Sequence, residues 1–85
     1  MVRVFFDGKC NLCSKEIRHY RKISDPKKFE WIDISCDSKP LLELNISQVE
    51  ALKLLHVVGN CGQIFIGVEA FRVIWREMPR WWVLD

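Results

Sequence analysis

The sequence predicts an α/β fold with a central mixed four-stranded sheet and helices on both faces, in the order βαβαββα. Three observations predict it: an apolar run at the start leads into an amphipathic helical pattern, a second apolar run follows, and two β-rich runs enclose a glycine-containing loop near the end. With 85 residues, 49% of them hydrophobic, the chain suffices for one compact domain over residues 1–85, with an apolar, Trp-containing tail at 80–85.

The first part of the chain predicts a strand and a helix. Val2 to Phe6 is a run of β-formers, and the Asp-Gly pair at 7–8 stops it with a turn. A helix is expected from Cys10 to about Ile23, where the Ser-Asp-Pro sequence at 24–26 ends it. Its apolar face consists of Cys13, Ile17 and Tyr20, at the spacing i, i+4 and i+7.

The middle of the chain predicts a strand, a linker and a helix. Phe29 to Ile34 favours a strand because its aromatic and β-branched residues fit a pleated surface. Residues 36–45 are expected to form a proline-containing linker. Ser47 and Glu50 fit a capping box, so a helix is expected from Gln48 to about Leu54.

The last part of the chain predicts a hairpin and a helix. His56 to Val58 and Gln63 to Ile66 flank a loop at 59–62 whose Gly and Asn residues suit a hairpin. Apolar residues then recur at helical spacing from Val68 to Met78, and Pro79 ends the helix. A right-handed crossover makes the first two strands parallel neighbours, and the hairpin extends the same sheet. This arrangement resembles the minimal, glutaredoxin-like form of the thioredoxin fold.

The charge balance gives no indication of wrapping of nucleic acid or docking to an anionic membrane, because 13 basic and 11 acidic residues leave a net charge of only +2. Basic residues gather between Lys15 and Lys28, as a solvated face or as a patch that attracts acidic partners or anionic thiols such as glutathione. No apolar run approaches the ~20 residues of a spanning helix, and Met1 to Phe6 is too short for a secretory signal. We therefore expect a cytoplasmic monomer or small homo-oligomer without nucleic-acid or membrane partners.

The Cys10-Asn11-Leu12-Cys13 sequence carries the strongest chemical signal, because it directly follows a strand and opens a helix. Cys10 lies in the first turn, where amides and the helix dipole favour a thiolate by about 0.3–1 kcal/mol. Lys9 adds to this effect and Asp7 opposes it. Cys13 lies one turn deeper on the apolar face, where it is suited to resolving a mixed disulfide. The sequence therefore predicts a thiol-disulfide oxidoreductase with Cys10 as nucleophile and Cys13 as resolving thiol.

Two other interpretations of the cysteine pair stay open: a structural zinc site, and a pair of inert buried cysteines. A zinc site needs about four ligands. The remaining cysteines and histidines belong to separate predicted elements and form no second paired motif; they are Cys36, Cys61, His19 and His56. We therefore expect neither a metal nor an organic cofactor.

The residues around the cysteine pair resemble a known family signature. Residues 6–13, FDGKCNLC, are similar to the DGxCxxC signature of the DCC family of thiol-disulfide oxidoreductases. The similarity continues in an Asp near the end of the second strand, a Val-Val run, a turn with Gly and a G-x-x-A element. These features correspond to Asp33, Val57-Val58, Gly62 and Gly67-Val68-Glu69-Ala70.

This resemblance implies a thioredoxin-like fold and the activity of a protein-disulfide reductase, carried by Cys10 and Cys13. Asp7 and Gly8 belong to the same signature. A disulfide-containing protein or a small thiol is the implied substrate, with glutathione as a candidate co-substrate. The main functional alternative is a non-catalytic binding module, whose contact surface would be aromatic. Its candidate residues are Trp75, Trp81 and Trp82.

Asp7, His56 and Gly67 are candidate supporting residues, each with a plainer structural alternative. Asp7 would relay a proton to Cys13 or accept hydrogen bonds from amides of the strand-to-helix turn. His56 stands in the region where thioredoxins and glutaredoxins place a cis-proline, and would aid proton transfer or simply pack. Gly67 would offer helix-start amides to a glutathione carboxylate, which Glu69 opposes, or allow close packing.

Overall fold

The computed structural model describes residues 1–35 and 37–78, with the backbone alone for residues 11–14. Four strands and four helices follow one another in this part of the chain: β1 (Val2–Phe6), α1 (Asn11–Ile23), β2 (Phe29–Asp33), α2 (Lys39–Leu42), α3 (Gln48–Lys53), β3 (His56–Val58), β4 (Ile64–Ile66) and α4 (Val68–Arg76). The predicted strands and the three longer helices are confirmed, with ends that differ by at most two residues. No helix among the described residues is long and apolar enough to cross a membrane.

The strands form one mixed sheet in the order β2-β1-β3-β4. β1 pairs in parallel with β2, from Val2 beside Phe29 to Phe6 beside Asp33. β1 and β3 are antiparallel, as are β3 and β4. The crossover and the hairpin therefore form as predicted, and the mixed sheet is consistent with a thioredoxin-like fold. Because β1 and β2 end together, the turn after Phe6 begins next to Asp33.

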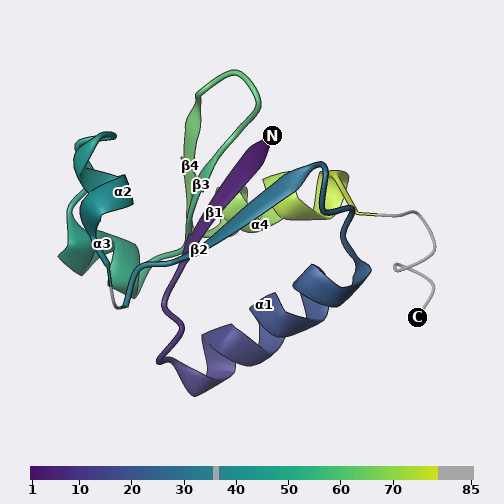
Figure 1. Cartoon of the computed structure of the whole chain (residues 1–85), viewed down its shortest axis with the longest axis horizontal. Coiled ribbons are helices and arrows are strands. Elements are labelled where there is room, and N and C mark those ends of the chain that lie inside the picture. Colours follow the sequence, from purple (N-terminus) through teal and green to yellow (C-terminus); the bar gives the residue numbers. More distant parts are fainter. Residues whose placement is uncertain (36, 79–85) are drawn as a thin grey trace.

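Helices cover both faces of the sheet, which gives the chain two apolar cores. On one face, α1 and α4 pack on alternate residues of β1, and the buried side chains include Val4, Ile17 and Ile74. On the other face, α2 and α3 pack on Phe5 and Val58 through Leu41 and Ala51. Figure 1 shows α2 and α3 together on one side of the strands, apart from α1 and α4.

The predicted linker at 36–45 is wrong, because its middle forms the short helix α2. Pro40 suggested a break, but it lies in the first turn of α2, where the missing amide hydrogen removes no helical hydrogen bond. Burial of Leu41, which is 1% exposed, supplies the tertiary stabilisation that so short a helix needs. Asn45, with φ of 57°, turns the chain out of this segment.

The predicted capping box at the start of α3 is also wrong. Ser47 is the N-cap residue, but its side chain makes no capping hydrogen bond. The first turn of α3 is exposed, so its amides are open to solvent. Gln48 fixes the helix by another route, because its Nε2 donates to the carbonyl of Ile34 at 3.1 Å. α3 is thereby tied to the chain that follows β2.

At the end of the described chain, α4 stops at Arg76, two residues before the predicted Met78. The loop between β3 and β4 uses Gly62 at a φ of 81°, a conformation that favours glycine, as its composition predicted. The predicted stop at Pro79 and the Trp-containing tail at 80–85 lie outside the described residues.

Candidate functional site

The link between β1 and α1 is a four-residue turn from Asp7 to Cys10. The amide of Cys10 donates to the carbonyl of Asp7 at 3.2 Å, and the amide of Lys9 donates to Asp7 Oδ1 at 3.0 Å. Cys10 is half-buried and directly precedes α1, and Cys13 lies in the first turn of that helix. Because Cys10 precedes α1, it adjoins the positive end of the helix dipole. No acidic residue in the first turn offsets this positive charge.

Asp33, at the end of β2, holds this turn from outside. Its Oδ1 accepts hydrogen bonds from the Gly8 amide at 3.0 Å, the Ser35 amide at 2.9 Å and the Ser35 hydroxyl at 2.6 Å. The Ser35 hydroxyl is the largest cause of a lowered pKa of the Asp33 carboxyl. The desolvation of this group opposes the shift, while the two amides and the charge of Lys9 add to it. Asp33 is thus an ionised anchor for the turn.

A residue without a side chain is favoured at position 8, because the Asp33 carboxylate lies close to the Gly8 backbone. A Cβ on Gly8 would overlap the Asp33 carboxylate and come within 2.5 Å of its Cγ. The φ of Gly8 is not positive, so the close approach of Asp33, rather than backbone freedom, explains the glycine. Sequence reasoning noted Asp33 only through a family resemblance. The parallel register, with Asp33 beside Phe6, is the signal that places it against the turn.

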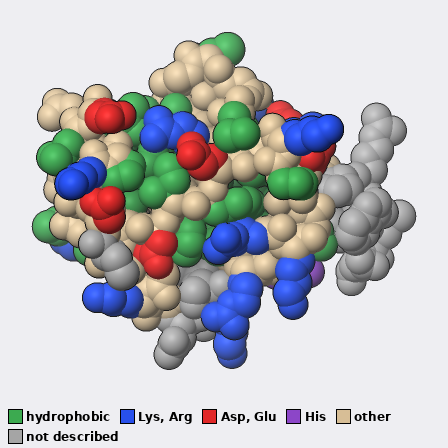
Figure 2. Space-filling model, in the orientation of Figure 1, with side chains coloured by type: hydrophobic (Ala, Val, Ile, Leu, Met, Phe, Trp, Pro, Cys, Tyr) green, Lys and Arg blue, Asp and Glu red, His purple; other side chains and the backbone are tan. Residues whose placement is uncertain are grey.

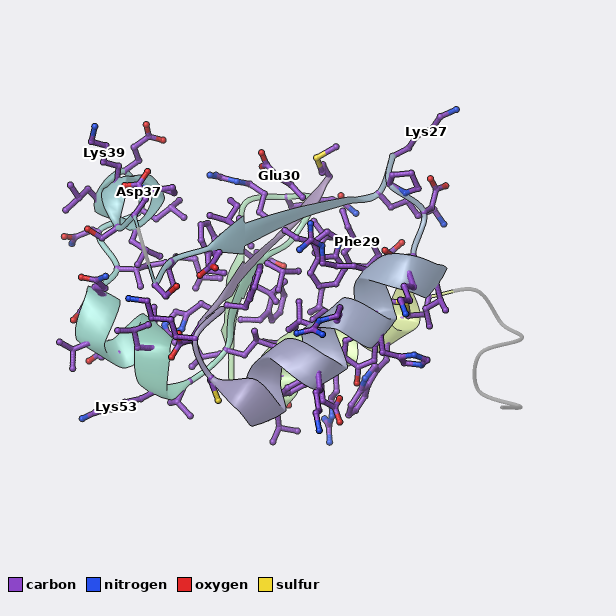
Figure 3. All side chains as sticks on the ribbon, turned by 60° about the horizontal axis from the view of Figure 1, so that its bottom comes forward. Lys27, Phe29, Glu30, Asp37, Lys39 and Lys53 are labelled. Atoms are coloured by element: carbon purple, nitrogen blue, oxygen red, sulfur yellow. The ribbon has the colours of Figure 1, made fainter. Side chains whose placement is uncertain are left out.

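An apolar groove of about 490 Å³ opens beside the turn. Asp7 forms one wall with Glu16 of α1, and the opposite walls come from the end of α3 and the start of α4. Its rim includes two exposed apolar side chains, Leu54 at 53% and Val68 at 64% exposure. In Figure 3, Lys53 marks the end of α3, which lines the groove together with Glu16 of α1. The Asp7 and Cys10 Cα atoms are closer than about 7 Å, because a hydrogen-bonded turn joins them.

His56 lies in β3 and is 2% exposed. Its Nδ1 is 2.8 Å from the carbonyl of Leu54, to which a protonated Nδ1 donates. The neighbouring Leu54 and Leu55 line the apolar groove, whereas His56 does not. The geometry favours the packing role for His56.

The Gly67 amide is not available for the predicted carboxylate, and Cys61 lies at the end of the sheet opposite to the turn. The amide of Gly67 donates to the carbonyl of Leu55 at 2.8 Å, so this amide is committed to the sheet rather than to a bound carboxylate. Cys61 is exposed in the loop between β3 and β4, and Cys36 lies outside the described residues. Within the part of the chain that the structure describes, no three His, Cys, Asp or Glu side chains group around a candidate metal position.

One curated relative covers nearly the whole chain. The chain is 26% identical over 84 residues to the uncharacterized chloroplastic protein At5g50100 of Arabidopsis thaliana. This match includes 96% of the chain but only 39% of the relative, so the chain spans about two fifths of the length of that protein. No solved structure shows a significant match to the chain.

The family comparison agrees with the signature at residues 6–13. The model of the DCC1-like thiol-disulfide oxidoreductase family matches residues 4–85, which include the turn, the cysteine pair, most of the sheet and the four helices of the described residues. The resemblance that the signature predicted is therefore confirmed over almost the full length of the sequence. The chain belongs to the DCC1-like thiol-disulfide oxidoreductase family.

Proposed function

We propose that this chain catalyses reversible thiol-disulfide exchange with a disulfide-containing protein, using Cys10 as nucleophile and Cys13 as resolving thiol. The observation that carries the proposal is the position of Cys10, half-buried at the start of α1 on a turn that Asp33 anchors. A helix start stabilises a thiolate, and the anchored turn keeps the sulfur in one place. Membership of the family supports the reaction class.

In the proposed reaction, the Cys10 thiolate attacks one sulfur of the substrate disulfide. The substrate S–S bond breaks, a mixed disulfide forms, and the released substrate thiolate takes up a proton. Cys13 then loses its proton and attacks Cys10, which releases the second substrate thiol. The substrate gains two electrons and the chain retains a Cys10–Cys13 disulfide. A thiol such as glutathione reverses this oxidation, and neither metal nor organic cofactor is needed.

The apolar groove supports a protein as substrate. It opens from Asp7, at the far end of the turn from Cys10, and its rim exposes Leu54 and Val68. An extended segment whose cysteine meets Cys10 would place a neighbouring apolar side chain in the groove, which removes both apolar surfaces from water. Asp7 stays a candidate for proton transfer to or from Cys13 in this proposal, although its Oδ1 already accepts the Lys9 amide.

The experiment that tests the proposal is equilibration of the protein in glutathione redox buffers. Differential alkylation and mass spectrometry then quantify the Cys10–Cys13 disulfide, with Cys36 and Cys61 as internal controls. We expect one reversible two-electron transition that is selective for Cys10 and Cys13, near the cytosolic potential of roughly −220 to −320 mV. Cys10→Ser should abolish exchange, whereas Cys13→Ser should trap the mixed disulfide.

The proposal fails if Cys10 and Cys13 never pair, or pair no more readily than Cys36 and Cys61. Cys61→Ser is the matched control, because Cys61 is exposed in a hairpin loop and should not influence the transition.

The apolar groove also favours a second candidate, a module that binds a protein segment without exchanging disulfides. Under this alternative, a partner protein would bind equally well to the wild type and to Cys10→Ser. Under the main proposal, capture of the partner requires the Cys10 sulfur and is reversed by a reductant.

A further inference from the structure

A second, polar hollow of about 340 Å³ lies between α1 and β2, on the other side of the turn from the apolar groove. We call it the α1–β2 hollow. Gly8 lines it at the turn, Arg18 and Arg21 line it from α1, and Trp31 and Asp33 line it from β2. Because Gly8 belongs to the turn that carries Cys10, one end of this hollow lies beside that turn.

Two guanidinium groups in this hollow have no carboxylate partner among the described residues. Arg18 and Arg21 are exposed and three residues apart, so they share one face of α1. In residues 1–35 and 37–78, the ion pairs join Arg3 to Glu30 and Arg72 to Glu69. Figure 2 shows Lys and Arg side chains gathered along the lower edge of the molecule, where α1 runs in Figure 1.

Asp33 lies in the same hollow but leaves these two charges available. Its Oδ1 already accepts three hydrogen bonds, two from Ser35 and one from the Gly8 amide, and neither arginine pairs with it. The charged lining, two cations and one anion, therefore retains a net positive charge. Guanidinium groups bind carboxylates through paired hydrogen bonds, so a carboxylate is the complementary ligand.

Trp31 gives the hollow a fixed apolar wall. Its ring stacks on Phe29, with 5.1 Å between the ring centroids and 20° between the planes, and packs against the core under α1. Figure 3 shows Phe29 between β2 and α1. The Phe29 ring thus supports the Trp31 indole from the side of the core. A side chain whose carboxylate approaches Arg18 or Arg21 would lay its methylene groups along the Trp31 indole. Glutamate fits both features.

We propose that the α1–β2 hollow binds an acidic segment of the disulfide partner, with a glutamate four or five residues from the cysteine that Cys10 attacks. The spacing follows from chain geometry. Arg18 and Arg21 lie about 12 Å and about 16 Å along α1 from Cys10, because a helix rises about 1.5 Å per residue, and an extended segment advances about 3.3 Å per residue. This inference rests on the proposed exchange function and adds a selection for acidic partners.

The test uses short peptides whose single cysteine carries a pyridyl disulfide, so that attack by Cys10 releases a coloured thiopyridone. One peptide has Glu four and five residues from the cysteine, and its control has Gln at both positions. We expect wild type to react about fivefold to tenfold faster with the Glu peptide, the effect of one or two exposed ion pairs. The preference should disappear in the Arg18→Gln/Arg21→Gln variant. It should also weaken at about 1 M salt, where screening acts within about 3 Å.

Lys27→Gln/Lys28→Gln is the matched control, because it removes the same charge from exposed positions outside the hollow. The inference is overturned if this control abolishes the preference equally, or if wild type reacts at one rate with both peptides. In the latter case the exchange function still stands. If neither peptide reacts, the exchange function fails, and the hollow is then tested by binding alone. Peptides with Ser in place of Cys should shift the Trp31 indole NMR signal with Glu but not with Gln, and equal shifts would overturn the inference.

Discussion

The amide of Gly8 donates a 3.0 Å hydrogen bond to Asp33 Oδ1, although the two residues are 25 positions apart in the sequence. This bond joins the ends of two parallel strands at the point where the chain turns towards Cys10. It also explains why the turn contains a glycine, since the carboxylate occupies the place of a side chain. The geometry of the proposed nucleophile therefore depends on a residue outside the cysteine motif.

Replacing Gly8 with Ala should destabilise the fold by about 1–2 kcal/mol, the range of a hydrogen bond to a charged group that faces solvent. The new Cβ would displace the Asp33 carboxylate and break its bond to the turn. Urea unfolding measures the loss. The cost should become much smaller in an Asp33→Ala background, because the collision and the bond are then already absent. An equal cost in both backgrounds would contradict the anchoring role.

The Asp33 carboxylate should make the free energy of unfolding depend on pH under acidic conditions. The Asp33 pKa is lowered from its ordinary value of 3.8, so its contribution to stability is present above about pH 4 and is lost as the pH falls through the folded pKa. Asp33→Asn keeps an oxygen acceptor but cannot ionise. The difference in unfolding free energy between wild type and Asp33→Asn should therefore shrink below about pH 4. Asp37→Asn is the control, since Asp37 is exposed on the linker before α2. A difference that is constant with pH would exclude Asp33 as an ionised anchor.

Periodicity and turn residues predicted most of the fold because those signals are local. The i, i+4 and i+7 pattern identified α1 through Ile17 and Tyr20, which are indeed buried, and the Gly and Asn residues of the loop at 59–62 identified the hairpin. α2 was missed because its stability is tertiary: Pro40 argues for a break, and only the burial of Leu41 explains the helix.

The candidate site was likewise predicted from local sequence features only in part. The spacing of Cys10 and Cys13 and their place after a strand are sequence features, so the motif was found directly. The contact of Asp33 with Gly8 and the opposed walls of the α1–β2 hollow depend on strand register and helix packing. No local pattern encodes these contacts. They required the arrangement of β1, β2 and α1 in space.

Mutation of the groove rim should reduce reaction with proteins more than reaction with small disulfides. Leu54→Ser combined with Val68→Ser removes apolar contacts that only an extended substrate reaches. We expect the ratio of the rates with insulin and with hydroxyethyl disulfide to fall about threefold to tenfold. Leu42→Ser is the control, because Leu42 is 72% exposed on α2, away from the groove. An unchanged ratio would mean that the groove does not hold the substrate.

His56 should matter for stability and not for the exchange rate. His56→Ala leaves a cavity in β3 and removes the bond to Leu54, at a cost of about 2 kcal/mol. His56→Asn should recover part of this loss, since its amide nitrogen can occupy the place of Nδ1. The measurements are urea unfolding and the rate of reaction with hydroxyethyl disulfide per folded molecule. A rate that falls tenfold in a stable variant would instead make His56 a proton-transfer residue.

Tyr20 links two helices through its hydroxyl, and its ionisation offers a direct readout of that link. The hydroxyl donates to Glu16 Oε2 at 2.7 Å and accepts from Trp75 Nε1 at 3.0 Å. Burial raises the Tyr20 pKa above 10.0, the Trp75 bond opposes this rise, and the bond and charge of Glu16 add to it. The neutral phenol therefore contributes to stability below about pH 10, and this contribution is lost as the pH rises through the folded pKa.

Because Tyr20 is the only tyrosine in the sequence, the ultraviolet absorbance of the phenolate reports its titration without interference from another tyrosine. The midpoint should lie above 10.0 in the folded protein and return towards 10.0 in urea. Trp75→Phe should raise the midpoint further, since a donor to the phenolate is lost, whereas Glu16→Gln should lower it. If both variants shifted the Tyr20 midpoint in the same direction, burial and not the two hydrogen bonds would control its pKa. Tyr20→Phe should abolish the signal and cost about 1 kcal/mol, because the bond to Trp75 of α4 and the bond to Glu16 within α1 disappear together.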